Sequence, residues 1–230
     1  MIRCAVFDLD GTLARVGEAV APQDLALLQT LRRKGVQIAL SSGKPTFYLC
    51  GFARQMGLAD AFLIGENGAV LQQGVDLPPP VFRRRAIPEA SEASLASLRT
   101  LLDEKFPGRL WFQPNELSLT PFLYHEEDFA PIRALLSSYL RPEMHLLWYE
   151  HPDCFDIEFD QFDKGAGIHL LSEVTGISPR EMVSVGDWTN DYAMFEKTGL
   201  SIGIRLPDPT KADFVVPDLT SALELILQNV

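Results

Sequence analysis

The sequence predicts an α/β fold: a doubly wound, Rossmann-like parallel sheet into which a small α+β domain of αββαββ order is inserted. Two observations predict it. Short apolar runs alternate with amphipathic segments at both ends of the chain, as in parallel strands joined by crossover helices. Between them, a middle segment follows a different rhythm. The chain has 230 residues, 47% of them hydrophobic and 22% charged, which suffices for such a core.

The first third of the chain alternates strand and helix. Residues 2–7 form an apolar run that is typical of a buried strand. A helix is expected over residues 22–34, because proline suits its first position and Gly35 suits its end. The next elements are expected in this order: a strand at 36–40, a helix at 45–56 that ends at Gly57, and a strand at 61–64. The alternation predicts parallel strands with crossover helices.

The rhythm changes after Ala69. Gly74 and the prolines at 78–80 disfavour both a helix and an inner strand. The elements expected beyond them are a helix at 91–105, strands at 109–113 and 117–120, a helix at 126–140, and strands at 144–149 and 154–159. We interpret residues 80–160 as a second domain, inserted into a core made of residues 1–79 and 161–230.

The alternation of predicted strands and helices resumes at Lys164. A helix is expected over residues 164–175, ending at Gly176, followed by a strand at 182–185. The remaining elements are expected as a helix at 190–197, short strands at 201–204 and 214–216, and a final helix from about residue 220.

Composition excludes several classes of protein. The net charge of −11 and the pI of about 4.8 argue against a nucleic-acid-binding protein, which normally carries a basic surface. No apolar stretch approaches the roughly 20 residues that span a bilayer, and the first apolar run is too short for a signal peptide. We therefore expect neither a nucleic-acid nor a membrane partner, and a cytoplasmic location. Cys4, Cys50 and Cys154 lie far apart, so no disulfide framework is expected.

Acidic residues follow two of the predicted strands. Asp8 and Asp10 end the first strand, and Asp187 follows the strand at 182–185. The carboxyl ends of parallel strands meet at one edge of a sheet, where ligands bind. Clustered carboxylates repel one another unless a cation joins them. Oxygen ligands favour a hard ion, and Mg²⁺ suits a site that also binds a phosphate.

A phosphate would find hydrogen-bond donors at the same edge. Ser42 offers a hydroxyl, Gly43 lets the backbone approach closely, and the helix after them offers free N–H groups. Lys164 offers a compact positive charge. A carboxylate beside a bound phosphoryl group can attack it and form an aspartyl-phosphate.

Four short motifs resemble those of the haloacid dehalogenase superfamily. In order, they are Asp8-Leu9-Asp10-Gly11-Thr12-Leu13, Ser42-Gly43, Lys164-Gly165, and Gly186-Asp187-Trp188-Thr189-Asn190-Asp191. The inserted segment lies between the second and third motifs, as does the C2B cap of the Cof-like (IIB) subfamily, and Glu66-Asn67-Gly68-Ala69 also resembles a segment common there. The cap is small, as in archaeal-type phosphoglycolate phosphatases. The resemblance implies an Mg²⁺-dependent phosphatase that acts on a small phosphorylated metabolite, such as phosphoglycolate or a sugar phosphate.

The resemblance also assigns roles to the acids and their neighbours. Asp8 is the expected nucleophile and a metal ligand, and Asp10 the expected general acid and base, with its backbone carbonyl on the metal. Asp187 is an expected metal ligand. For Asp191, direct ligation, ligation through water and orientation of Lys164 all stay open. The substrate-binding residues that the resemblance implies are Ser42, Gly43, Lys164 and Asn190. For Asn190, support of the metal ligands is an open alternative.

Two residues depart from the family pattern. Lys44 stands where arginine often follows the second motif, and Trp188 stands where a small residue is usual. Trp188 either narrows the site or packs in the core. Asn67-Gly68 is either a hairpin turn or part of the site, and the arginines at 83–85 are interpreted as a solvated linker.

Some alternatives stay open at this stage. A phosphomutase or phosphotransferase would pass the phosphoryl group to a sugar instead of water, and a regulatory relative would be catalytically silent. The identity of the substrate is not predicted, and either a monomer or a homodimer is compatible with the sequence.

Overall fold

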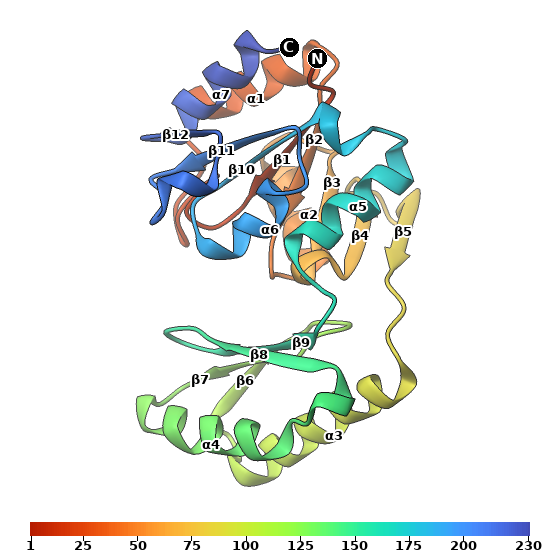
Figure 1. Cartoon of the computed structure of the whole chain (residues 1–230), viewed down its shortest axis with the longest axis vertical. Helices are drawn as coiled ribbons and strands as arrows, with labels where there is room; N and C mark the ends of the chain where they lie inside the picture. Colours follow the sequence, from red (N-terminus) through yellow and green to blue (C-terminus); the bar gives the residue numbers. More distant parts are fainter. The chain divides into compact units, whose positions relative to one another are not determined.

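The computed structural model describes all 230 residues, and it divides into two compact units. The core unit comprises residues 1–84 and 163–230, and the inserted unit comprises residues 85–162. Each is described by itself (Figure 1). None of the helices in either unit combines the length and apolar character needed to cross a membrane.

The core unit contains an eight-stranded sheet of order β12-β11-β10-β1-β2-β3-β4-β5. Six strands from β12 to β3 are parallel, and β4 and β5 continue the sheet by antiparallel pairing. The strands are β1 Cys4–Asp8, β2 Gln37–Ser41, β3 Phe62–Gly65, β4 Val70–Gln73, β5 Val81–Arg84, β10 Met182–Gly186, β11 Leu200–Ile204 and β12 Phe214–Val216.

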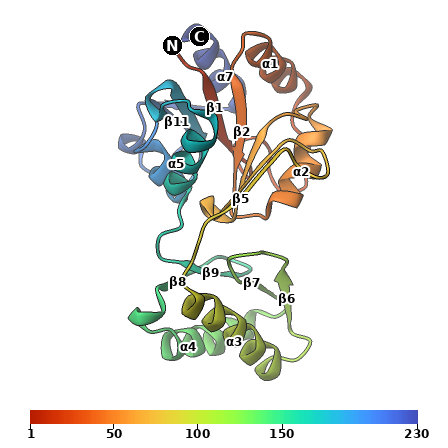
Figure 2. The ribbon, with the colours of Figure 1, turned by 90° about the vertical axis from the view of Figure 1, so that its right-hand side faces the viewer.

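Helices cover both faces of this sheet, as a doubly wound fold requires. One face packs against α1 (Pro22–Arg33), α2 (Thr46–Gln55) and α7 (Leu219–Gln228). The other packs against α5 (Lys164–Thr175) and the short α6 (Tyr192–Phe195). Figure 2 shows α1 and α2 on one side of the strands and α5 on the other. The predicted fold class is confirmed.

The alternation of buried residues along β1 explains the two layers. Phe7 belongs to the apolar cluster with α1, α2 and α7, whereas Val6 belongs to the cluster with α5 and α6. Successive side chains of a strand point to opposite faces, so Asp8 follows Val6 toward the α5 side. The last residue of β1 therefore projects toward the start of α5.

The core unit contains two strands that were not predicted, β4 and β5. Asn67 and Gly68 lie in a turn between antiparallel β3 and β4, so their hairpin interpretation is confirmed. Val81–Arg84, interpreted as the start of the inserted domain and a solvated linker, forms the edge strand β5 of the core sheet. Its arginines are nevertheless exposed. Prolines precede β5 without entering it, which is where a sheet edge tolerates them.

The inserted unit has the predicted αββαββ order. Its elements are α3 Glu89–Lys105, β6 Leu110–Gln113, β7 Thr120–Leu123, α4 Phe129–Tyr139, β8 Leu146–Glu150 and β9 Phe155–Phe159. Strands pair as β6-β7 and β8-β9, and isolated bridges join Leu119 to Ile157 and Phe122 to Cys154. The helices pack on one face of these strands around Leu98, Leu136 and Phe155. Strand β7 starts three residues later than expected and contains Pro121, which pairs opposite Phe112.

Single 3₁₀ turns complete the secondary structure. They are η1 Glu66–Gly68, η2 Glu126–Asp128, η3 Pro142–Met144, η4 Pro179–Glu181, η5 Thr189–Asp191 and η6 Pro209–Lys211. The helix expected over residues 190–197 is instead η5 followed by the single turn of α6.

Candidate active site

The acidic residues gather where β1, β10 and β2 end. Asp8 is the last residue of β1 and pairs in register with Ser41 at the end of β2. Asp187 comes directly after Gly186, the last residue of β10. Helix α5 begins at Lys164, so the ends of three parallel strands and the start of one helix supply the side chains. This is the strand edge at which the sequence analysis expected them.

Lys164 lies between two carboxylates in the interior. Its Nζ donates to Asp8 Oδ1 and to Asp191 Oδ1, each at 2.6 Å. The Lys164 side chain is only 1% exposed. Burial by itself would lower the pKa of Lys164, but the charges of Asp8 and Asp191 outweigh it and raise that pKa. Lys164 is therefore a fixed positive charge beside Asp8.

Asp8 is buried, with 6% of its surface exposed. Burial raises the pKa of Asp8 from 3.8 to about 7. Lys164 opposes this rise, whereas the charges of Asp191 and Asp187 add to it. The nearby carboxylates therefore outnumber the single lysine, Lys164. Such an excess of negative charge attracts a cation.

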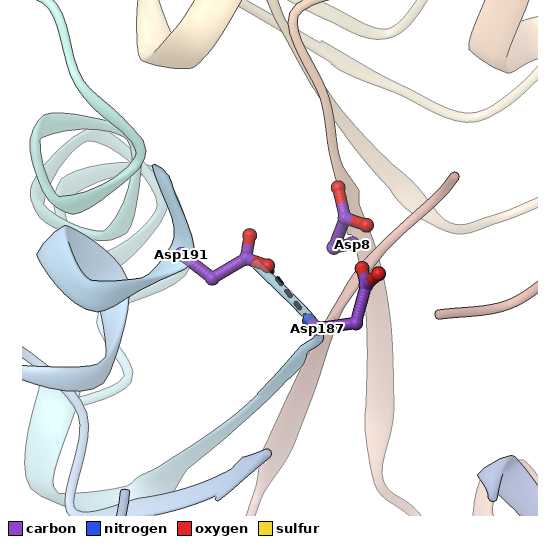
Figure 3. Close-up of side chains that lie close together, drawn as sticks. All are labelled: Asp8, Asp187 and Asp191. Carbon is purple, nitrogen blue, oxygen red and sulfur yellow. Dashed lines mark hydrogen bonds between the residues drawn. The ribbon is translucent and has the colours of Figure 1, made fainter. Parts of the chain in front are cut away.

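Asp8, Asp187 and Asp191 form a cluster whose oxygen atoms lie within 4.8 Å of one another (Figure 3). Burial and the charge of Asp191 raise the pKa of Asp187 as well. An all-oxygen set of closely spaced carboxylates fits a hard divalent cation and does not fit a soft metal. The residues present therefore suit a hard divalent cation.

Asp191 already has partners for both of its oxygens. One oxygen accepts from Lys164. The other accepts from the backbone N–H groups of Asp187 at 2.9 Å and Trp188 at 3.0 Å. Figure 3 shows the Asp191 carboxylate turned toward the Asp187 backbone. Of the three roles open for Asp191, the hydrogen bonds favour the orientation of Lys164 and of the Asp187 loop.

Thr12 contributes to the site, although its sequence position predicted no role for it. Its hydroxyl donates to Asp187 Oδ1 at 3.0 Å, and the side chain is 4% exposed. Gly11 lies beside the same carboxylate with a φ of +93°, and a Cβ at Gly11 would overlap Asp187. The Asp-x-Asp-Gly-Thr motif could have indicated this role. Its glycine leaves room for the Asp187 carboxylate and its threonine binds that carboxylate, so the two residues bring the end of β1 close to the loop after β10.

Asp10 lies outside this buried cluster. It sits on a turn in which Leu13 N–H donates to Leu9 O and Gly11 N–H donates to Ala14 O. The Asp10 side chain is 31% exposed and forms an ion pair with Lys44. The two acids of the first motif therefore have different environments and different lysine partners.

The loop after β2 is tied to the Asn67 turn. Ser42 is buried and accepts from Lys44 N–H at 3.2 Å, so its hydroxyl does not cap α2. Asn67 N–H donates to Ser42 O at 3.1 Å. A Cβ at Gly43 would lie 3.5 Å from the Asn67 amide, so that amide lies close beside the loop. The Asn67 turn is thus a hairpin that also supports the second motif.

Two residues of the fourth motif lie at the surface. Trp188 is 60% exposed, which excludes the core as its location. Asn190 is exposed on η5. A role of Asn190 in substrate binding stays a prediction.

Comparisons with known proteins identify the family. The family model for haloacid dehalogenase-like hydrolases matches residues 5–77 and 111–207. A phosphoglycolate phosphatase of Methanoculleus marisnigri is 26% identical, with 89% of this chain and 85% of that protein covered. An HMP-PP phosphatase of Klebsiella pneumoniae is 25% identical, with 86% and 82% covered. A haloacid dehalogenase-like hydrolase from Bacteroides thetaiotaomicron has a similar fold, with a TM-score of 0.81, 16% identity, and 98% and 100% of the two chains covered. This chain belongs to the haloacid dehalogenase-like hydrolase family.

Proposed function

We propose that this enzyme is an Mg²⁺-dependent phosphatase that hydrolyses a small phosphorylated metabolite through a phosphorylated Asp8. The observation that carries the proposal is the position of Asp8. Asp8 lies at the end of β1, accepts a hydrogen bond from Lys164 and lies close to Asp187. The negative charge of these carboxylates would attract a cation. The matched proteins carry two different names, phosphoglycolate phosphatase and HMP-PP phosphatase, and both support the same reaction class.

The first half-reaction transfers the phosphoryl group to Asp8. One Asp8 oxygen attacks phosphorus, and the bond between phosphorus and the ester oxygen breaks. The departing oxygen takes a proton from the Asp10 carboxyl, so an alcohol leaves. Lys164 and Ser42 are proposed to bind the transferring oxygens, with Gly43 leaving room for the backbone.

The second half-reaction returns Asp8 to its starting state. Asp10, now a carboxylate, removes a proton from water as the water oxygen attacks phosphorus. The bond between phosphorus and Asp8 breaks, which releases inorganic phosphate and the free carboxylate. Asp10 regains its proton, so both acids are ready for another cycle.

The proposed metal ligands are Asp8, Asp187 and the backbone carbonyl of Asp10. When bound, Mg²⁺ neutralises the carboxylates and polarises the phosphoryl oxygens. Asp191 is proposed to act through Lys164 or a bound water, because both of its oxygens have protein partners.

The proposed substrate class is a small phosphate monoester, either phosphoglycolate or a sugar phosphate. The first is the substrate for which several of the matched phosphatases are named. We also propose that the inserted segment, expected over residues 80–160, is a cap domain of the C2B type. The compact unit within the chain comprises residues 85–162.

Three measurements test the proposal. Release of inorganic phosphate from p-nitrophenyl phosphate, phosphoglycolate and monosaccharide phosphates should require Mg²⁺ and stop in EDTA. Asp8→Asn should abolish release with an unchanged circular dichroism spectrum, whereas the exposed control Asp60→Asn should retain it. When a reaction with substrate labelled in its phosphoryl group is quenched rapidly, the wild-type protein should carry the label. Hydroxylamine, which cleaves an acyl phosphate, should remove that label.

Each measurement also has an outcome that contradicts the proposal. Absence of phosphate release from every probe refutes the phosphatase. Release without a labelled protein, or release by Asp8→Asn, refutes the covalent route. Transfer of the phosphoryl group to an added sugar in place of water identifies a phosphotransferase.

A further inference from the structure

Lys44 is held between Asp10 and an aromatic ring. Its Nζ forms an ion pair with Asp10 Oδ2 and lies 5.4 Å from the centroid of the Tyr48 ring, in the first turn of α2. The Lys44 side chain is 25% exposed, so most of it is covered. A lysine at this position is one of the two departures from the family pattern.

The backbone of Lys44 is fixed on both sides. Its N–H donates to Ser42 Oγ at 3.2 Å, and its carbonyl accepts from Glu66 N–H at 3.1 Å. Gly65 packs so closely that an added Cβ would lie 2.8 Å from Thr46 N and 2.9 Å from Lys44 O. The ammonium therefore extends from an anchored base, and its position is set by the loop after β2.

The Asp10 carboxyl sits on a different loop. The turn at residues 9–14 is closed by backbone hydrogen bonds, but these leave the torsions of the Asp10 side chain free. A carboxyl that transfers a proton must point at the reacting oxygen within hydrogen-bond reach. The ion pair with Lys44 joins the two loops and restricts where the carboxyl points.

We infer that Lys44 is a positioning residue for proton transfer by Asp10. The inference rests on the proposed phosphatase chemistry. Lys44 Nζ binds Oδ2, which leaves Oδ1 as the oxygen that carries the proton to the departing ester oxygen and later removes one from water. Lys44 keeps its charge throughout and exchanges no proton. A protonated Asp10 still accepts from Lys44 through its carbonyl oxygen.

Substrates with different leaving groups depend to different degrees on proton transfer by Asp10. An alkoxide is a strongly basic leaving group and needs a proton as it departs, whereas nitrophenolate leaves without one. The ratio kcat/KM reports the steps up to departure of the leaving group. Loss of Lys44 should therefore reduce kcat/KM for alkyl phosphates much more than for p-nitrophenyl phosphate.

The experiment compares Lys44→Met, Lys44→Arg and the control Lys34→Met, which removes an exposed lysine at the end of α1. The probes are ethyl phosphate, phosphoglycolate and p-nitrophenyl phosphate. We expect Lys44→Met to lower kcat/KM by roughly 10-fold or more on both alkyl phosphates and by less than about 3-fold on the nitrophenyl ester, a split that general-acid catalysis predicts. Lys44→Arg should recover part of the loss, and Lys34→Met should match the wild type on all probes.

Other patterns overturn the inference. An equal loss on all three probes indicates a general structural role. A loss confined to phosphoglycolate, with a raised KM, indicates that Lys44 binds the substrate carboxylate. A wild type that turns over none of the probes refutes the proposed function and this inference together, whereas an active wild type with either of the first two patterns refutes the inference alone.

Discussion

The raised pKa of Asp8 makes the stability of the metal-free protein depend on pH in an unusual direction. In the unfolded chain this carboxyl titrates near 3.8, and in the folded core unit near 7. Between these values the folded protein binds more protons than the unfolded one. The unfolding free energy must therefore fall as the pH rises from about 4 to about 7, opposite to the usual behaviour of a stabilised carboxylate.

The size of the effect follows from the two pKa values. The full displacement corresponds to about 4 kcal/mol at 1.36 kcal/mol per pH unit. Over the accessible range from about pH 5 to about pH 8, the linkage relation gives a loss of about 2.5 kcal/mol from Asp8 alone. Asp8 is almost fully buried, so solvent screens little of this effect.

Urea unfolding in EDTA at several pH values measures this quantity. Asp8→Asn keeps the shape of the side chain but removes its titration, so the difference between the wild-type and variant curves reports Asp8 together with its interaction with Asp187. We expect that difference to change by about 2.5 kcal/mol across the range, and excess MgCl₂ to flatten the wild-type curve because a bound cation favours the carboxylate. Parallel wild-type and Asp8→Asn curves would refute the reasoning.

Three further predictions test other contacts. Lys164→Met should lower the free energy of unfolding, measured in urea, by about 3–5 kcal/mol, because it leaves the buried Asp8 and Asp191 without the lysine ammonium. A loss below about 1 kcal/mol would contradict this expectation. Thr12→Val should weaken Mg²⁺ binding by about 10-fold, because the Asp187 carboxylate loses the hydroxyl that orients it. Calorimetry measures this affinity, and an unchanged value would show that Thr12 does not orient Asp187. Arg109→Met should lower the unfolding free energy of the inserted unit by about 2 kcal/mol, because it leaves the buried Asp128 without its donor. Arg133→Met breaks an exposed pair and should cost under about 1 kcal/mol. Equal effects of the two arginine variants in urea unfolding would be inconsistent with this difference in burial.

The proximity of the acidic residues at one edge of the sheet was predictable, because it depends on the topology of the sheet alone. Parallel strands carry their carboxyl ends to one edge, so Asp8 and Asp187 had to meet once both strands were recognised. The start of α5 at Lys164 was likewise expected, because the motif order placed it just before β10. These inferences need no knowledge of side-chain torsions.

The pairings within the cluster were not predictable in the same way. Thr12 and Asp187 are 175 residues apart, and neither pattern nor spacing shows which carboxylate the hydroxyl reaches. Asp191 was open to three roles until its two oxygens were seen to bind Lys164 and the loop backbone. Strand β4, with the sequence Val-Leu-Gln-Gln, escaped prediction because four residues without alternation carry too little periodic signal.

The contrast between Asp8 and Asp10 is the strongest physical argument for a division of labour between them. They are two residues apart, so strand alternation alone would give them equal surroundings. Gly11 and the turn behind it end the strand at once, which leaves Asp8 buried against Lys164 and places Asp10 nearer solvent against Lys44. A nucleophile benefits from a fixed position inside the charged cluster, whereas a group that exchanges protons with an alcohol and with water must reach both. When two neighbouring carboxylates receive different environments, different chemical roles become available to them, and this site provides that difference with one lysine for each acid.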